Sequence, residues 1–241
     1  MKLDDIRKLQ QKKYRAEFGH FLVEGEHLLL ELQKAAEHNP PLLACELYVT
    51  AAYEHWQSPF RTHLIGERQM AQIADTRTPQ GILAVVPMAA LAPVPAAPGE
   101  RAIYLHEIQD PGNLGTILRT LAWFGGWRCL LSPGSVDPYN PKVVRSSMGA
   151  IFHTPLELDV PLESLGERFA RIACLDMQGE PVQSAGFQAF DCYLFGNEAR
   201  GVPREQLAAL DARPFSVPGC GAIESLNLAM TVGMCAYELQ R

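Results

Sequence analysis

A proline- and alanine-rich segment, PMAALAPVPAAPGE at residues 87–100, separates two parts of the chain. It carries four prolines, Pro87, Pro93, Pro95 and Pro98. Such a segment is stiff and extended, and it has no apolar pattern that could build a core. With 241 residues, 47% of them apolar, the chain has enough material for a core on either side. We therefore expect one domain at residues 1–88, a linker at residues 89–99 and a second domain at residues 100–241.

Both parts mix helix and strand patterns. In the N-terminal part, GEHLLLELQKAAEH and ERQMAQIA are typical of helices, whereas ELYVT, THLIG and GILAVVP are typical of strands. After the linker, the strand patterns AIYLH, WRCLLS, RIACLD, CYLFG and RPFSV alternate with the helix patterns NLGTILRTLAWFG, PKVVRSSMG and PREQLAAL. This alternation favours an α/β fold, in which a small α/β domain precedes a mostly parallel sheet with helices on both faces.

The last predicted helix is apolar on nearly every side. Between Leu226 and Tyr237, only Asn227 and Thr231 are polar. A helix of this kind is buried within its domain or in a subunit interface, so the pattern favours a homodimer. We also expect three aromatic residues near the end of an earlier helix to lie in the core, namely Trp123, Phe124 and Trp127.

Composition argues against several classes of protein. The six cysteines are far apart and form no C-x-x-C pair, so we expect free, mostly buried thiols and no metal site. No apolar run approaches the roughly 20 residues that cross a bilayer, and the first residues lack the apolar centre of a signal peptide. We therefore expect a cytoplasmic protein.

The net charge of −6 hides an uneven distribution. Residues 1–20 carry six basic and three acidic side chains, and residues 101–150 carry five basic and three acidic ones. These two stretches are a candidate footprint for a polyanion, and ordinary solvated helix faces are the alternative.

Three loops are candidates for a ligand site, because ligands of open parallel sheets bind beyond the C-terminal ends of the strands. They are HEIQDPGNLGTILRT (106–120), LFGNEARGV (194–202) and PGCGAIESLNLA (218–229). The third resembles a glycine-rich nucleotide turn but lacks the last glycine of the dinucleotide fingerprint. The chain also has no P-loop, H-E-x-x-H or G-x-S-x-G motif, which leaves an NTPase, a zinc protease or a serine hydrolase without support.

Five polar side chains in these loops are candidates for chemistry. Asn113 is expected to cap the first helix, and Arg119 points about 150° away from the apolar stripe of that helix, where it suits a phosphate or carboxylate. Glu198 follows an apolar strand and is open to three roles: a base, a partner of Arg119 or a first-turn acid. Ser225 is expected to cap the last helix. Asn227 is a polar exception in that helix and needs a partner if it is buried.

In this order, the three loops resemble the three motifs of the SpoU family of RNA ribose 2′-O-methyltransferases, in the SPOUT superfamily. The matching residues are Asn113 and Arg119 in DPGNLGTILRT, Gly196 and Glu198 in GNEARG, and Ser225, Leu226 and Asn227 in ESLN. VVRSSMGAIFHTPL (143–156) is similar to a further segment of the family. KYRAEFGHFLVEG (13–25) resembles the start of the RNA-binding domain that often precedes the catalytic one.

The resemblance implies a fold, a reaction and a set of partners. The C-terminal domain would be a SPOUT α/β domain with a deep trefoil knot, and the N-terminal domain would have a ribosomal-protein-like α/β fold. The chain would bind S-adenosylmethionine (AdoMet), methylate a ribose 2′-hydroxyl of rRNA or tRNA, and form a homodimer through the knotted domain.

The resemblance also implies roles for individual residues. The catalytic set would be Asn113, Arg119, Glu198, Ser225 and Asn227. The cofactor would lie against Gly196, Val217 and Leu226, and RNA would contact Lys12, Lys13, Arg15, Arg119 and Arg145. Because a guanidinium stays protonated in proteins, we expect Arg119 to hold the RNA phosphate, and Glu198, Ser225 or a water to accept the proton of the hydroxyl.

Three positions depart from the family pattern, and three other functions stay open. Ala199 stands where glycine is common, Gly219 where methionine is common and Ala229 where serine is common, which affects details of cofactor contacts. The alternatives are a non-catalytic RNA-binding protein with the same fold, a SPOUT enzyme that methylates a base, and a nucleotide-dependent oxidoreductase. The sequence names neither the RNA nor the nucleotide.

Overall fold

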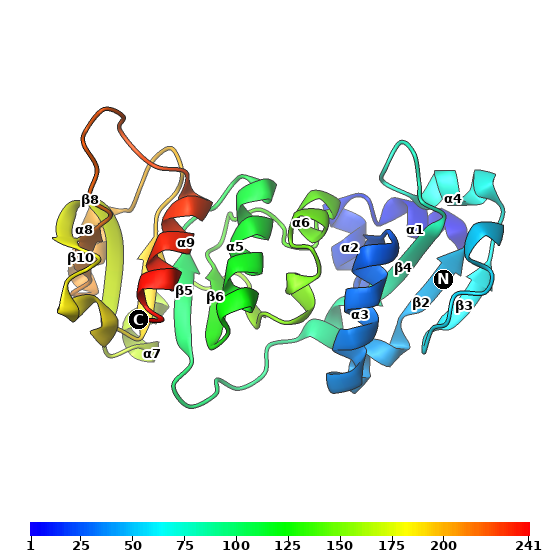
Figure 1. Cartoon of the computed structure of the whole chain (residues 1–241), viewed down its shortest axis with the longest axis horizontal. Helices are drawn as coiled ribbons and strands as arrows, with labels where there is room; N and C mark the ends of the chain where they lie inside the picture. The colour runs from blue at the N-terminus through cyan, green and yellow to red at the C-terminus, as the bar shows by residue number, and fades with distance from the viewer. The chain divides into compact units, whose positions relative to one another are not determined.

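The computed structural model describes all 241 residues, Met1–Arg241. They form two compact units, which Figure 1 colours along the chain. The first unit comprises Met1–Ala92 and Asp137–His153, and the second comprises Pro93–Val136 and Thr154–Arg241. This division differs from the expected domain limits at residues 137–153, which pack with the N-terminal residues, and at residues 89–92 of the expected linker, which belong to the first unit.

The first unit is built on a four-stranded mixed sheet with the strand order β1-β4-β2-β3. Its strands are β1 (His20–Glu24), β2 (Glu46–Val49), β3 (Arg61–Leu64) and β4 (Ile82–Pro87). β4 is antiparallel to both β1 and β2, and β3 is parallel to β2. The helices are α1 (Leu3–Lys8), α2 (Lys12–Phe18), α3 (Glu26–His38), α4 (Glu67–Ile73) and α6 (Pro141–Ser146). Ile6, Leu22, Met70 and Leu83 belong to its apolar core.

A buried ion pair and an aromatic contact help to join residues 137–153 to the first unit. The Arg15 guanidinium lies 2.5 Å from the Asp137 carboxylate and also donates to the Leu9 carbonyl at 2.8 Å. The ring of Phe21 packs against that of Tyr139, with 4.8 Å between their centroids. Arg15 is only 3% exposed, and its guanidinium is paired with Asp137 inside the unit. This corrects the expectation that Arg15 contacts RNA.

The second unit is built on a six-stranded sheet with the order β10-β8-β9-β5-β6-β7, in which every neighbouring pair is parallel. Its strands are β5 (Arg101–Leu105), β6 (Trp127–Leu131), β7 (Leu156–Glu157), β8 (Ile172–Pro181), β9 (Cys192–Phe195) and β10 (Arg213–Ser216). Its helices are α5 (Pro111–Phe124), α7 (Leu165–Arg168), α8 (Arg204–Ala209) and α9 (Leu228–Glu238). The expected α/β fold with a parallel sheet is confirmed.

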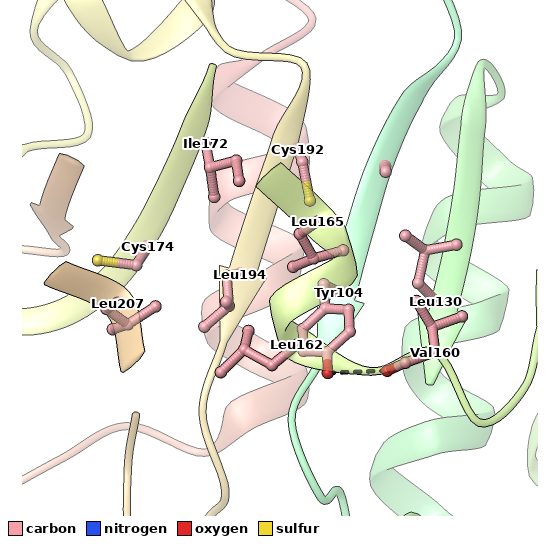
Figure 2. Close-up of a cluster of buried hydrophobic side chains, with 11 residues drawn as sticks. Tyr104, Leu130, Val160, Leu162, Leu165, Ile172, Cys174, Cys192, Leu194 and Leu207 are labelled. Atoms are coloured by element: carbon pink, nitrogen blue, oxygen red, sulfur yellow. Dashed lines mark hydrogen bonds between the residues drawn. The ribbon is translucent and has the colours of Figure 1, made fainter. Parts of the chain in front are cut away.

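The core of the second unit lies on both faces of this sheet. Every residue of β6 and β9 is buried, as expected for parallel strands covered on both sides. Figure 2 shows one face, where Leu130, Leu165 and Leu194 surround Tyr104, whose hydroxyl donates to the Val160 carbonyl at 3.0 Å. The aliphatic stripe predicted for α5 is buried in the same unit.

The cysteines are free, and all except Cys220 are buried, which confirms the expectation for the thiols. Burial raises the pKa of the Cys174 thiol to about 11 and that of Cys129 to about 12. These thiols therefore stay protonated near neutral pH and act as small apolar side chains. No helix has both the length and the apolar character needed to cross a membrane.

Candidate active site

The loops of the first two motifs meet because their strands are neighbours in the sheet. β5 and β9 pair in parallel, with Leu105 opposite Phe195, and the His106 amide donates to the Phe195 carbonyl at 2.9 Å. The residues that follow both strands therefore emerge at the same edge of the sheet. This is the edge where the strand-end rule predicts a ligand site.

Three of the predicted catalytic side chains form one hydrogen-bonded cluster. The Asn227 amide group donates to the Asn113 side-chain oxygen at 2.9 Å. The Asn113 amide group in turn donates to Glu198 Oε1 at 3.3 Å. Each of the three residues comes from a different motif, so the fold gathers parts of the chain that lie 85 and 114 residues apart.

Glu198 makes further contacts that define its role. Its carboxylate also accepts from the backbone amides of Gln109, at 3.2 Å, and Asp110, at 3.3 Å. With Asn113, three N–H groups at the start of α5 point to one carboxylate. The arrangement suits a group that fixes the first-motif loop better than a group that accepts a proton from substrate.

The helix caps differ from those expected. Asp110 is the N-cap of α5 and accepts from the Asn113 amide at 2.7 Å. Asn227, and not Ser225, is the N-cap of α9, accepting from the amides of Ala229 at 2.9 Å and Met230 at 3.2 Å. Because Asn113 does not have to cap its own helix, its side chain is available to Glu198 and Asn227.

The glycine of the second motif is required by close packing. A Cβ atom on Gly196 would overlap the backbone of Gly201 and Val202. Gly201 itself has φ +68°, in the left-handed region. Between the two glycines, the chain makes a tight turn that carries Glu198.

Arg119 and Ser225 lie outside the hydrogen-bonded cluster. Both are exposed, and neither side chain makes a hydrogen bond or ion pair with another residue. Arg119 is six residues beyond Asn113 on α5, which corresponds to about 9 Å along the axis and about 120° around it. Within one chain, then, the guanidinium is not bonded to Glu198, and it is free for another partner.

The third loop has the features of a surface that binds a ligand through its backbone. Residues 217–226 make no backbone–backbone hydrogen bond, and all of them except Val217 are exposed. Leu226 is 44% exposed and Ile223 is 70% exposed, so apolar side chains lie beside unpaired peptide groups. Adenosine needs this combination of apolar contact and backbone hydrogen bonds, and the residues therefore fit the predicted cofactor.

One histidine borders the site. His106 directly follows β5, and its half-buried imidazole has an Nδ1 atom without a hydrogen-bond partner. Burial lowers the pKa of His106, so the ring is neutral near pH 7. The ring stacks on that of Tyr104, with 6.5 Å between the ring centroids.

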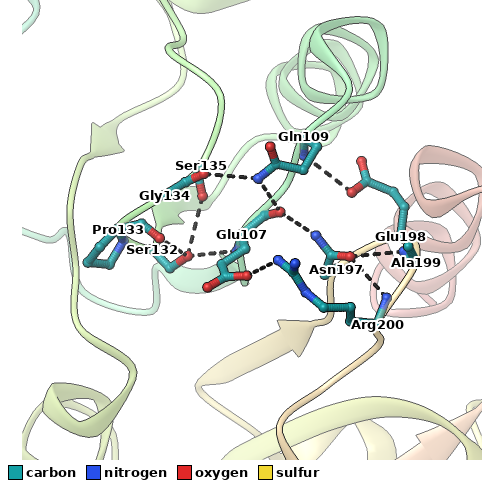
Figure 3. A network of polar contacts seen from close by, with 10 residues as sticks. All are labelled: Glu107, Gln109, Ser132, Pro133, Gly134, Ser135, Asn197, Glu198, Ala199 and Arg200. Atoms are coloured by element: carbon teal, nitrogen blue, oxygen red, sulfur yellow. Dashed lines mark hydrogen bonds and ion pairs between the residues drawn. The ribbon is translucent and has the colours of Figure 1, made fainter.

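Asn197, which organises the second-motif turn, was not among the predicted site residues. Its side chain donates to the Glu107 carbonyl at 2.7 Å and accepts from the amides of Ala199 and Arg200 at 2.9 and 3.0 Å. Figure 3 shows this network. A signal was present, since an asparagine before a short polar stretch and a glycine favours an Asx turn.

Comparison with known proteins agrees with this geometry. Residues 100–237 match the SpoU rRNA Methylase family, and residues 1–84 match the MRM3-like substrate binding domain. The chain is 30% identical to the 23S rRNA (guanosine(2553)-2′-O)-methyltransferase RlmP of Bacillus subtilis, over 99% of this chain and 96% of that protein.

Solved structures that resemble this chain are also RNA methyltransferases. A TrmH-family protein from Porphyromonas gingivalis is 29% identical, with a TM-score of 0.84 over 98% of this chain and 96% of that one. An AdoMet-bound rRNA methyltransferase from Sinorhizobium meliloti is 25% identical, with a TM-score of 0.81 over 99% of this chain and 93% of that one.

Fold, site and relatives together define the class of protein, an RNA methyltransferase that uses AdoMet. More specifically, the chain belongs to the SpoU rRNA methylase family. The expectations of family, reaction and cofactor are confirmed, and the roles of individual site residues stay predictions.

Proposed function

We propose that this chain methylates a ribose 2′-hydroxyl of ribosomal RNA, at the edge of the sheet where β5, β9 and α9 meet. The observation that carries this proposal is the Asn113–Glu198–Asn227 cluster beside the open loop at residues 217–226. RlmP, which is similar over nearly the whole chain, is named for the same reaction on 23S rRNA. We also propose a cytoplasmic location, which the likeness to rRNA methyltransferases of bacteria supports.

Different residues of the site are proposed to bind the cofactor and to orient the loops. AdoMet, when bound, supplies a methyl group activated by a sulfonium. The partly buried Gly196 and Val217 and the exposed Leu226 are proposed to hold it, through backbone and apolar groups of their loops. Asn113 and Asn227 orient each other and the start of α5.

Arg119 and Ser225 supply the groups that face the RNA. A guanidinium binds a phosphate with two parallel hydrogen bonds, which would hold the target ribose in line with the methyl donor. Because both carboxylate oxygens of Glu198 already accept hydrogen bonds, we assign proton acceptance to Ser225 or to a water rather than to Glu198.

The finer architecture is also part of the proposal. We propose that the second unit contains the deep trefoil knot of the family and that the chain is a homodimer. The exposed apolar side chains of α9, Met230 at 59%, Met234 at 40% and Tyr237 at 62%, support the dimer. They lie at i, i+4 and i+7 and so share one face of the helix.

RNA is proposed to contact the first unit as well. Lys12 and Lys13 are exposed on α2. Arg145 on α6 is 40% exposed but already pairs with Asp75 at 2.6 Å, so its contact with phosphate requires exchange of that partner. Residues 1–88 would then form the RNA substrate-binding domain and residues 100–241 the methyltransferase domain.

The test is to incubate the purified chain with labelled AdoMet and 23S rRNA, and to digest the product for mass spectrometry. A methylated ribose is the expected product. A methylated base would instead support the alternative of a base methyltransferase. Absence of transfer to 23S, 16S and transfer RNA, with RNA binding retained, would support a non-catalytic RNA-binding protein.

A further inference from the structure

The turn that carries Glu198 is stabilised by hydrogen bonds of one buried residue, Asn197. Asn197 is 6% exposed, whereas Glu198, Ala199 and Arg200 are all exposed. Its backbone exchanges two hydrogen bonds with Gly201, at 2.9 and 2.8 Å, and its side-chain oxygen accepts two amides within the turn. The position of this exposed turn is therefore determined by its buried first residue.

The Asn197 side chain also joins the turn to the loop after β5 by a hydrogen bond. Asn197 Nδ2 donates to the Glu107 carbonyl at 2.7 Å. The Gln109 side chain donates to that carbonyl too, at 3.0 Å, and to the Gly134 carbonyl at 2.9 Å. A second contact between the turn and this loop is an exposed ion pair of the Arg200 guanidinium with the Glu107 carboxylate (Figure 3).

Glu198 depends on this arrangement because its own contacts are long. Its three donors lie at 3.2 to 3.3 Å, close to the upper limit for an N–H···O hydrogen bond. A small shift of the turn would break all three and release the start of α5. We infer that Asn197 is a positioning residue for methyl transfer, acting through Glu198 on the loop of the first motif. This inference rests on the proposed function.

Two substitutions test it, Asn197→Ala and Asn197→Asp. Aspartate keeps the size and the two acceptor bonds but cannot donate to the Glu107 carbonyl when it is ionised. In both variants we expect kcat, at saturating AdoMet, to fall by about 10- to 100-fold, the range expected for a misplacement near 1 Å. The KM for RNA should stay within about threefold, because no RNA contact is removed.

Two further variants serve as comparisons. Asn39→Ala removes another side-chain amide that donates to a carbonyl, that of Ala90 at 2.8 Å, but it lies in the first unit. It should leave kcat unchanged. Arg200→Ala removes the exposed ion pair with Glu107. Because exposed ion pairs are weak, kcat should change less than about threefold.

A second measurement does not require activity. Hydrogen exchange of the Gln109 and Asp110 amides should quicken in both Asn197 variants and not in Asn39→Ala. If the wild-type protein transfers no methyl group, the proposed function is refuted. The exchange rates of the Gln109 and Asp110 amides would still test the positioning role of Asn197. The inference is overturned if a folded Asn197→Asp variant keeps the wild-type kcat or wild-type exchange. It is also overturned if neither Asn197 variant folds, since Asn197 would then be a stability residue.

Discussion

The Arg119 side chain on α5 is exposed and has no hydrogen-bonding or ion-pair partner within the chain. It stays protonated in proteins and so suits a phosphate rather than proton transfer. Arg119→Ala should lower the rate of methyl transfer by about 100-fold or more, as when one preorganised donor is lost. The affinity for AdoMet, measured by calorimetry, should stay within a few-fold.

The matched control for Arg119 is Arg204→Ala. Arg204 is an exposed arginine on α8, and it pairs with Asp176 at 3.4 Å. Its loss should leave both the rate and the cofactor affinity unchanged. Calorimetry showing that Arg119→Ala abolishes AdoMet binding would mean that Arg119 is structural or directed to the cofactor.

Asn227 has two separable functions, and two substitutions distinguish them. Its oxygen caps α9, while its amide group donates to Asn113. Asn227→Ala loses both and should lower the free energy of unfolding by about 1 kcal/mol. Asn227→Asp keeps the cap, so urea denaturation should give stability near that of the wild type, whereas kinetics should show methyl transfer reduced about tenfold in both variants. Full activity of Asn227→Asp would show that the contact with Asn113 is dispensable.

At the scale of elements, α2 presents basic side chains with opposite environments. Lys12 and Lys13 are exposed, whereas Arg15 is buried against Asp137. The double change of Lys12 and Lys13 to Glu should weaken RNA binding and flatten its salt dependence, with stability changed by about 0.5 kcal/mol or less. Arg15→Ala leaves a mostly buried carboxylate without its partner and should cost about 3 kcal/mol.

The two effects on α2 are measured separately. RNA affinity across salt concentrations gives the slope, and urea denaturation gives the stability. Arg7→Ala, which removes an exposed arginine of α1, is the control for stability. A salt slope unaffected by the lysine changes would exclude Lys12 and Lys13 from the RNA interface.

The elements themselves could be predicted from periodicity, but their partners could not. The apolar spacing of Leu114, Ile117 and Leu118 predicts α5 because it reflects burial on one face. The cap of that helix was assigned to Asn113, although Asp110 directly before Pro111 is a recognised helix start; the tertiary contacts of the Asn113 side chain could not be predicted. The contacts that join residues 137–153 to the first unit include an ion pair between residues 122 apart in sequence, which no local pattern encodes.

The same distinction applies to the candidate site. The strand-end rule and the motif resemblance pointed to Asn113, Glu198 and Asn227 because those signals concern residue type and order. Asn197 was missed because its importance lies in burial and in a bond to the Glu107 carbonyl, which is 90 residues away. Residue type alone does not distinguish it from an ordinary loop asparagine.

At the scale of the whole molecule, the second unit leaves an apolar surface uncovered. α5 and α9 pack together, with 6.4 Å between the ring centroids of Phe124 and Tyr237. Trp123 on α5 is 84% exposed, so the expectation that it lies in the core was wrong, and Met230 on α9 is 59% exposed. Exposed apolar side chains on two packed helices favour a protein interface, and the proposed homodimer would cover them.

Arg119 precedes Trp123 by one helical turn, so it lies on the same face of α5 as these exposed apolar side chains. If the proposed homodimer forms through these side chains, the unpaired Arg119 guanidinium would lie at the interface, and we predict that it acts at the Glu198 cluster of the other subunit. Mixed dimers of Arg119→Ala and Glu198→Ala chains test this geometry. Each variant alone should be inactive, but a mixed dimer would contain one complete site and should regain about half of the wild-type rate, as expected for one intact site of two.

Tagging the two chains differently allows the mixed dimers to be purified and their methyl transfer to be measured against each parent. If Arg119 and Glu198 served the same site from one chain, both sites of the mixed dimer would be defective and no activity would return. Mixing two separately purified Arg119→Ala samples controls for gains from subunit exchange alone. Regained activity would thus require both the dimer and a site completed across it, because a monomer with these substitutions has no source of the missing group.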